Sequence, residues 1–327
     1  MRIVINGFGR IGRTVLRQIL TRPDSQGVTV AAINDIAPLD TCAYLFKYDS
    51  VFGPYPGTVG AGDAALKIGD LEIPFTQQPD LSALDLAGVD VVMECTGKAD
   101  TIEIAKRGLE AGARNVLISG PSHAAEKTLV LGANEDQLGE HRIVSNGSCT
   151  TNALAPLLRG LDDAVGIEAG HMTTIHCYTG SQPMVDAPRG PLERSRAGGV
   201  SMVPTTTSAT KLVGKVVPQI NGRITGAAVR VPAISVSAVD LTVSWKKAVG
   251  EPVNGLLQRV FAESPVIGFT GDRVVSTDMR TRPESLVIAL PETLSASDRQ
   301  ARIFGWYDNE WGFSCRMIDM ARLMAER

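Results

Sequence analysis

The chain has 327 residues and a formal net charge of −3, with 44% hydrophobic and 20% charged residues. This balance is typical of a globular protein, and the length leaves room for two domains with buried cores. No strongly basic tract is present, so the usual signature of a dedicated nucleic-acid binder is missing, and no apolar run approaches the roughly 20 residues of a membrane span.

Residues 1–145 alternate short apolar runs with helical patterns. The stretch 42–85 is rich in Gly, Pro and Asp and predicts a β excursion. Continuous β-branched runs between helices favour a parallel sheet covered on both faces. The periodicity predicts strands at 2–6, 28–34, 89–96, 115–119 and 142–146, and helices at 10–22 and 98–113, the latter with Asp100 as N-cap.

The segment "NGFGRIG" joins the first strand to the first helix and carries Gly7, Gly9 and Gly12 in G-x-G-x-x-G spacing. Such a turn lets the backbone approach a pyrophosphate at a helix N-terminus. Asp35 ends the next strand, about 20 residues on, where a carboxylate binds the adenosine ribose and disfavours a 2′-phosphate. A tight turn without a ligand is the alternative, but the context favours a Rossmann-type, parallel-sheet NAD domain.

The second half of the chain has a different texture. A leucine stripe from Leu154 to Leu161 predicts a helix after Asn152, and residues 312–327 predict another. A long irregular stretch, 179–201, has a length that is usually functional. Strands that alternate with period two favour an α+β domain with a mostly antiparallel mixed sheet. These strands are predicted at 171–179, 223–232, 235–245 and 302–308.

Cys149 lies in the hydroxyl-rich stretch "SNGSCTTNALAPLL", immediately before the leucine-striped helix. A helix N-terminus and a nearby imidazole both stabilise a thiolate, so Cys149 is a candidate nucleophile rather than an inert buried thiol. His176, at the end of an alternating strand, is the best-placed base among four histidines, although a core histidine is the alternative.

The other four cysteines, at positions 42, 95, 177 and 315, are interpreted as packing residues. Their spacing matches neither a disulfide framework nor a metal site, so we expect no metal and a reducing, cytoplasmic location.

A dinucleotide site and an activated thiol together suit aldehyde oxidation through a thioester. The chain strongly resembles the phosphorylating glyceraldehyde-3-phosphate dehydrogenase family, nearly from end to end. The resemblance implies NAD as cofactor, a small phosphorylated aldehyde and inorganic phosphate as partners, and a homotetramer. It is carried by "INGFGRIGR", "IND", "ECTG", "IVSNGSCTTN", "TTIHCYTG", "RVPAISVSAVDL" and "WYDNEWGFS".

The resemblance also implies roles for single residues. Cys149 matches the catalytic thiol and His176 the base, while the loop 179–201 resembles one that lies near NAD and across a subunit contact. Matching cofactor positions are Gly7, Gly9, Arg10, Ile11, Gly12, Asp35, Gln77, Ser119 and Asn309, the last holding the nicotinamide amide. Matching positions for the two phosphates are Ser148, Thr150, Thr179, Arg194, Thr207, Ser208 and Arg230.

Some positions depart from the family pattern. Ser181 stands where the family usually has Asp, Ser208 where it has Gly, Ala153 where it has a second cysteine, and Gln77 where it has a basic residue near the adenine. The segment 189–193 also differs. The thiol, the imidazole and the nicotinamide anchor are kept.

We therefore expect residues 1–148, with the C-terminal helix 312–327, to form the NAD-binding domain, and residues 149–311 the catalytic domain. The expected reaction is NAD-dependent oxidation of D-glyceraldehyde 3-phosphate to 1,3-bisphosphoglycerate, with Cys149 carrying a hemithioacetal and then a thioester.

Three alternatives remain open at this point. "HRIVSN" and "LDDAVGIEAG" resemble erythrose-4-phosphate dehydrogenase, in which water cleaves the thioester, whereas Thr179 and Thr207 favour use of phosphate. A semialdehyde dehydrogenase is disfavoured by "DNEWGFS", and a nucleotide-binding scaffold without turnover by the presence of both Cys149 and His176.

Overall fold

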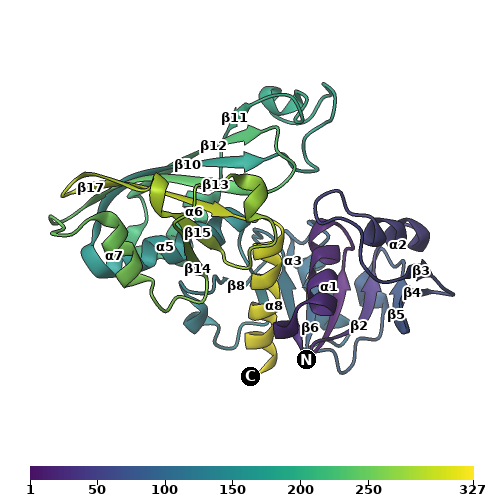
Figure 1. The fold of residues 1–327 in the computed structure, drawn as a ribbon. Coiled ribbons are helices and arrows are strands. Elements are labelled where there is room, and N and C mark those ends of the chain that lie inside the picture. The colour runs from purple at the N-terminus through teal and green to yellow at the C-terminus, as the bar shows by residue number, and fades with distance from the viewer. The chain divides into compact units, whose positions relative to one another are not determined.

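The structure, a computed structural model, describes residues 1–327 and divides into two compact units. The first unit comprises Met1–Leu129, Glu135–Gly147 and Ser314–Arg327, and the second comprises Val130–Asn134 and Ser148–Phe313. Each unit has its own sheet and helices (Figure 1), which confirms the predicted class of a parallel-sheet α/β unit followed by a mixed, mostly antiparallel one.

The first unit holds a nine-stranded sheet in the order β3-β4-β5-β2-β1-β6-β7-β9-β8. All neighbours from β5 to β8 run parallel, while β3, β4 and β5 form an antiparallel meander at one edge. Its strands are β1 Arg2–Asn6, β2 Thr29–Asn34, β3 Val59–Ala61, β4 Ala65–Ile68, β5 Leu71–Thr76, β6 Val91–Glu94, β7 Asn115–Ile118, β8 Lys127–Thr128 and β9 Ile143–Ser145. Its helices are α1 Arg10–Thr21, α2 Leu39–Lys47, α3 Ile102–Ala105, α4 Arg107–Glu110 and most of α8, Trp311–Ala325.

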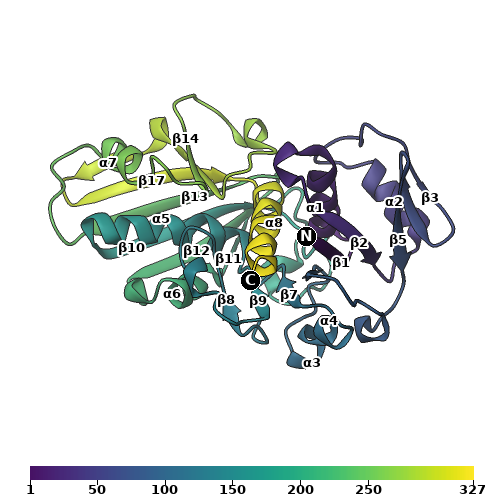
Figure 2. The ribbon, with the colours of Figure 1, turned by 90° about the horizontal axis from the view of Figure 1, so that it is seen from below.

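Helices cover both faces of this sheet, as continuous apolar strands require. Val4 packs with Val92, Val116 and Ala105 on the face that carries α3 and α4. Ile5 points to the opposite face and meets Gly12 of α1. Figure 2 shows α1 on one side of β1 and β2, and α3 and α4 on the other.

The second unit holds an eight-stranded sheet in the order β11-β12-β10-β13-β17-β15-β14, with β16 paired to β17. Only β10–β12 and β14–β15 are parallel pairs. Its strands are β10 Ile167–Cys177, β11 Val203–Thr205, β12 Ile224–Val231, β13 Ser237–Trp245, β14 Ile267–Thr270, β15 Leu286–Ala289, β16 Leu294–Ser297 and β17 Gln300–Tyr307. Its helices are α5 Cys149–Val165, α6 Ala209–Val216 and α7 Val253–Val260.

The core of the second unit lies between its sheet and these three helices, which gather on one face (Figure 1). Leu154, Leu157, Leu158 and Leu161 of α5 are fully buried there, so the leucine stripe is the core-facing side of the helix. This packing fixes the first residue of α5, Cys149, beside the sheet.

Three local predictions are wrong. The helix expected at 98–113 breaks at Lys106 into α3 and α4, and its N-cap is Thr101 rather than Asp100, whose carboxylate accepts the backbone N–H of His123. The β excursion begins only at Val59, because Leu39–Lys47 is helical. The leucine-striped helix starts at Cys149 instead of after Asn152.

Two classes of feature are not found in the chain. No group of three or more His, Cys, Asp or Glu side chains lies close enough together to hold a metal ion. None of the helices combines the length and the apolar character needed to cross a membrane.

Candidate active site

The glycine turn of the first unit shows why each glycine is there. Gly7 has φ of +94°, and a Cβ at this position would lie 2.7 Å from the backbone of Cys95 and Thr96. A Cβ on Gly12 would lie 2.2 Å from the carbonyl oxygen of Gly7. Gly9, in contrast, has no atom within 4 Å of a would-be Cβ. Gly7 and Gly12 are therefore required by packing, whereas Gly9 leaves space open to a ligand.

The N-terminus of α1 is suited to an anion. Gly9 is its N-cap, no side chain caps the helix, and no acidic residue stands in its first turn. Arg10 and Ile11 are the first helical residues, so their backbone N–H groups are among those without an intrahelical acceptor. A pyrophosphate is the ligand that such a helix end favours.

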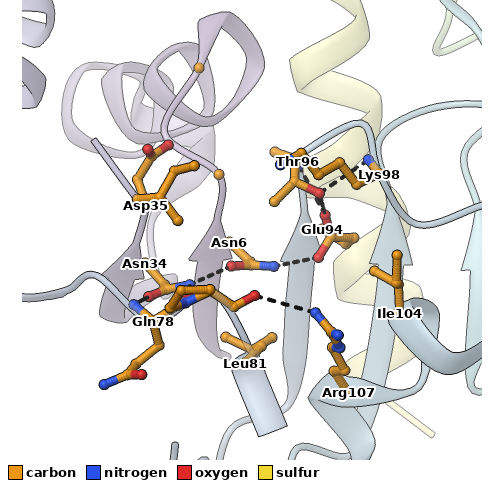
Figure 3. Close-up of a pocket in the computed structure, with 15 residues that line it drawn as sticks. Asn6, Asn34, Asp35, Gln78, Leu81, Glu94, Thr96, Lys98, Ile104 and Arg107 are labelled. Carbon is orange, nitrogen blue, oxygen red and sulfur yellow. Dashed lines mark hydrogen bonds between the residues drawn. The ribbon is translucent and has the colours of Figure 1, made fainter. Parts of the chain in front are cut away.

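A cavity of about 250 Å³ opens beside this turn (Figure 3). Its lining includes Gly9, Asp35, Ile36 and Thr96. Asp35 is held in place because its two oxygens accept the backbone N–H groups of Phe8, at 2.5 Å, and Ala37, at 2.8 Å. The open glycine, the uncapped helix and the fixed carboxylate fit the phosphate and ribose parts of a dinucleotide.

The floor of the cavity carries a row of polar side chains that sequence reasoning missed. Glu94, Asn6 and Asn34 occupy matching register positions at the ends of β6, β1 and β2. The amide of Asn6 donates to Glu94, and the amide of Asn34 donates to Asn6 at 2.8 Å (Figure 3). Thr76 Oγ1 donates to Asn34 Oδ1 at 2.7 Å. The available signal was the polar residue that ends each otherwise apolar strand.

Six residues predicted for the cofactor lie outside this cavity lining: Arg10, Ile11, Gly12, Gln77, Ser119 and Asn309. Arg10 pairs with Asp49 at 2.6 Å and stacks on Phe52. Gln77 donates to the carbonyl oxygen of Ala37 at 3.2 Å. Ser119 hydrogen-bonds to the thiol of Cys95, and Ile11 and Gly12 belong to α1. Lys98, Ile104 and Arg107, which sequence reasoning did not single out, do line the cavity.

In the second unit, Cys149 is the first residue of α5. Ser148 is the N-cap, and its hydroxyl accepts the backbone N–H of Thr151 at 3.1 Å. Cys149 Sγ lies 3.6 Å from Nε2 of His176, the penultimate residue of β10. The positive end of a 17-residue helix and an imidazole therefore meet at one thiol.

Two groups fix the imidazole from its other side. His176 Nδ1 lies 2.7 Å from the carbonyl oxygen of Cys177 and 2.7 Å from Arg230 Nη1. The carbonyl can only accept and the guanidinium can only donate, so the two contacts favour opposite tautomers. With the proton on Nδ1, Nε2 presents a lone pair to Cys149 Sγ and can take the thiol proton.

The electrostatic setting keeps both partners neutral. Burial raises the pKa of the Cys149 thiol, and the Thr150 hydrogen bonds and the Arg230 charge only partly offset it. Burial and the Arg230 charge lower the pKa of His176 to about 4. Near neutral pH the pair is thus a thiol beside a neutral imidazole, an arrangement in which Nε2 can accept the thiol proton.

Two arginines place positive charge beside this pair. Arg230 stands opposite His176 in the parallel β10–β12 register, and its charge interacts with that of Arg194. Arg194 Nε donates to Thr205 Oγ1 at 2.9 Å. Two guanidinium groups near a nucleophile form a setting for phosphate groups.

The predicted phosphate hydroxyls have intramolecular partners. Thr179 Oγ1 lies 3.0 Å from Ser181 Oγ, and Thr207 Oγ1 accepts the backbone N–H of Ala209 at the start of α6. Ser208 is the N-cap of α6 but makes no side-chain capping bond. Thr150 Oγ1 lies 2.8 Å from the hydroxyl of Tyr307.

Tyr307 is a buried residue that sequence reasoning missed. Its hydroxyl bridges Thr150 and Thr174, at 2.8 Å from each, and its ring stands edge-on to His176 with centroids 6.1 Å apart. The tyrosine thus links the start of α5 to β10, the strand that carries the candidate base.

Asn309 follows β17 and precedes α8 in the same unit. Its Oδ1 accepts hydrogen bonds from Cys177 Sγ at 3.2 Å and from Ser237 Oγ at 3.3 Å. The carboxamide is therefore held by its oxygen, and one of its two donors, Cys177, directly follows the candidate base in the chain.

Comparisons with known proteins show similarity over nearly the whole chain. The family model described as "Glyceraldehyde 3-phosphate dehydrogenase, NAD binding domain" matches residues 1–102, and "Glyceraldehyde 3-phosphate dehydrogenase, C-terminal domain" matches residues 148–309. The chain is 42% identical to glyceraldehyde-3-phosphate dehydrogenase of Xanthobacter flavus, over 100% of this chain and 99% of that protein. It is 44% identical to the proteins of that name from Cereibacter sphaeroides and Pseudomonas aeruginosa, over 99% of this chain and 98% of each relative.

Proposed function

Because the chain belongs to the glyceraldehyde-3-phosphate dehydrogenase family, we propose that it oxidises D-glyceraldehyde 3-phosphate to 1,3-bisphosphoglycerate with NAD and inorganic phosphate. The observation that carries the proposal is the 3.6 Å approach of Cys149 Sγ to His176 Nε2 at the N-terminus of α5, beside the charges of Arg230 and Arg194.

The cofactor role falls to residues 1–148 with the helix 312–327, and the catalytic role to residues 149–311. The N–H groups that open α1 would bind the pyrophosphate, and Asp35 the adenosine ribose. Asn309 would bind the nicotinamide carboxamide, with Ser119 as a further contact. NAD, when bound, supplies the hydride acceptor that aldehyde oxidation requires.

The first chemical task of the protein is addition to the aldehyde. His176 Nε2 takes the proton of the Cys149 thiol, and the sulfur attacks the aldehyde carbon. The imidazolium then returns this proton to the former carbonyl oxygen, which completes the hemithioacetal and leaves His176 neutral. Arg230 and Thr179 would hold the phosphate of the substrate. As the hemithioacetal carbon is oxidised, His176 accepts the proton of its hydroxyl, which leaves a thioester on Cys149.

The second task is acyl transfer. An oxygen of inorganic phosphate attacks the thioester carbon, the bond between that carbon and Cys149 Sγ breaks, and the acyl phosphate leaves. The Cys149 thiolate then takes back the proton held by His176, which restores the starting pair. Ser148, Thr150, Thr207, Ser208 and Arg194 are the residues we assign to this phosphate. The two arginines beside the thiol support phosphate, rather than water, as the acceptor.

We also propose that the chain is a cytoplasmic homotetramer. The loop 179–201 exposes large apolar side chains, with Met184 92% and Leu192 88% exposed, and such a patch is typical of a subunit contact. All five cysteines are free, as expected in a reducing compartment. Sedimentation analysis would check the oligomeric state.

The test is NADH production from glyceraldehyde 3-phosphate with inorganic phosphate varied. We expect turnover to require phosphate, to be lost in Cys149→Ser, and to fall at least about 100-fold in His176→Gln, the lower end of general-base contributions. Erythrose 4-phosphate and NADP are assayed in parallel. Rapid turnover of erythrose 4-phosphate without phosphate would instead identify the alternative dehydrogenase, in which water cleaves the thioester.

A further inference from the structure

Cys177 follows the candidate base on β10, and its side chain points to the opposite face of the strand. It is 1% exposed, which by itself suggests a packing residue. Its contacts indicate more, because both its backbone and its thiol bind side chains that the proposed reaction uses.

The contacts form a closed ring of hydrogen bonds. The backbone N–H of Cys177 donates to Ser237 Oγ at 3.2 Å. That hydroxyl donates to Asn309 Oδ1 at 3.3 Å, and Cys177 Sγ donates to the same oxygen at 3.2 Å. The serine hydroxyl thus accepts a hydrogen bond from the backbone of Cys177 and donates its own proton to Asn309.

The ring selects one of the two orientations of the Asn309 carboxamide. Burial raises the pKa of the Cys177 thiol to about 12, so the sulfur keeps its proton and remains a donor. If the carboxamide were reversed, the thiol proton and the serine proton would both lose their acceptor inside the protein, where an unpaired polar group is costly. With the oxygen saturated, Asn309 presents its NH₂ group to a ligand.

We propose that the Cys177 thiol, together with Ser237, is a positioning device that fixes Asn309 as a hydrogen-bond donor toward the carbonyl oxygen of the nicotinamide carboxamide. The inference rests on the proposed function only in the ligand assigned to Asn309. The backbone carbonyl of Cys177 contacts His176 Nδ1, so one residue orients both the base and the carboxamide that would hold the nicotinamide.

The test compares NAD binding in Cys177→Ala, Cys177→Ser and wild type by calorimetry, which needs no turnover. Loss of one buried donor should weaken NAD binding about threefold to tenfold in Cys177→Ala, because Ser237 alone then holds the orientation of Asn309. Cys177→Ser keeps a donor and should bind within about twofold of wild type. Cys315→Ala, which removes a buried thiol bonded to Arg22 in the first unit, is the matched control and should bind NAD as wild type does.

A second probe separates positioning from packing. In the thionicotinamide analogue of NAD, sulfur replaces the amide oxygen and is a poorer acceptor. Wild type should therefore prefer NAD over the analogue, and Cys177→Ala should lose most of that preference. If Cys177 only fills space, Cys177→Ala would weaken binding of NAD and of the analogue equally, and the ratio of the two affinities would stay as in wild type. That result would overturn the inference. Wild-type affinity of Cys177→Ala for NAD would overturn it as well.

If Cys177→Ala does not fold, Ser237→Ala replaces it in the test. This variant removes the other hydrogen-bond donor to Asn309 and should lower the ratio of the affinity for NAD to the affinity for the analogue. An unchanged ratio in Ser237→Ala would overturn the inference. Failure of the proposed function is seen separately, as absence of phosphate-dependent NADH production by the wild-type enzyme.

Discussion

Arg230 has opposite effects on the reactivity of the two groups of the proposed catalytic pair, Cys149 and His176. Its charge lowers the pKa of the Cys149 thiol, which favours the nucleophile, and lowers the pKa of His176, which weakens the base. The two effects of Arg230 on the cost of ionising the pair therefore oppose each other. Together with burial, the Arg230 charge keeps the imidazole of His176 neutral, and so able to accept a proton, at every pH above the low pKa of that group.

This balance predicts the behaviour of Arg230→Gln. Removal of the cation should raise the pKa of His176 from about 4 toward its ordinary value of about 6.5, as followed by NMR titration of the imidazole. The kcat/KM for the aldehyde should fall about tenfold or more, because the charge-assisted hydrogen bond that we propose between Arg230 and the phosphate of the substrate is lost. Arg230→Lys, which retains the charge, should keep the low pKa. A His176 titration that does not move in Arg230→Gln would show that burial alone sets it.

At the scale of elements, the packing of α5 against α7 overrides local helix preference. Gly160 lies inside α5, where alanine is ordinarily about 1 kcal/mol more favourable. A Cβ at this position would come within 2.5 Å of the buried ring of Phe261 and 3.2 Å of Val260. The two helices therefore need glycine at their contact.

We accordingly predict that Gly160→Ala destabilises the second unit by about 1–3 kcal/mol, as overpacking does, despite the better helix former. Urea unfolding followed by circular dichroism measures the change. The double variant Gly160→Ala with Phe261→Leu should be less destabilised than the sum of the two single changes, because the smaller side chain makes room. A more stable Gly160→Ala would mean that the ring shifts at little cost.

The sequence could predict the parts of the candidate site that depend on local patterns, but not those that depend on strand order. The glycine turn and the start of α5 are local patterns, so Gly7, Gly12 and Cys149 could be interpreted from spacing alone. Arg230 and Asn309 could not be placed in this way, because their neighbours depend on strand order. Arg230 reaches His176 through the parallel β10–β12 pair, and Cys177 meets Ser237 and Asn309 through the β10–β13–β17 order. Cys177 was interpreted as packing for the same reason.

For the whole molecule, buried titratable groups limit stability at both ends of the pH range. Burial raises the pKa of Cys42 and Cys315 to about 11, and of Cys95 and Cys177 to about 12. Because each of these thiols has a higher pKa in the folded than in the unfolded chain, it contributes to stability. The contribution is complete at pH values below the unfolded thiol pKa of about 8.5 and is lost as the pH rises through the pKa values of the folded protein.

His176 sets the corresponding limit on the acid side. Its folded pKa of about 4 is below the unfolded value of about 6.5, so between these two pH values the unfolded chain binds more protons than the folded chain. The contribution of the neutral His176 to the free energy of unfolding is complete above pH ~6.5. It is lost as the pH falls toward ~4, and the total loss is on the order of 3 kcal/mol. His176→Gln removes the titration, so its melting temperature should fall less steeply than that of wild type over this range.

His171→Gln, a change of an exposed histidine on the same strand, is the control and should follow the wild-type curve. Parallel curves for wild type and His176→Gln would contradict the buried, neutral imidazole from which the proposed chemistry starts.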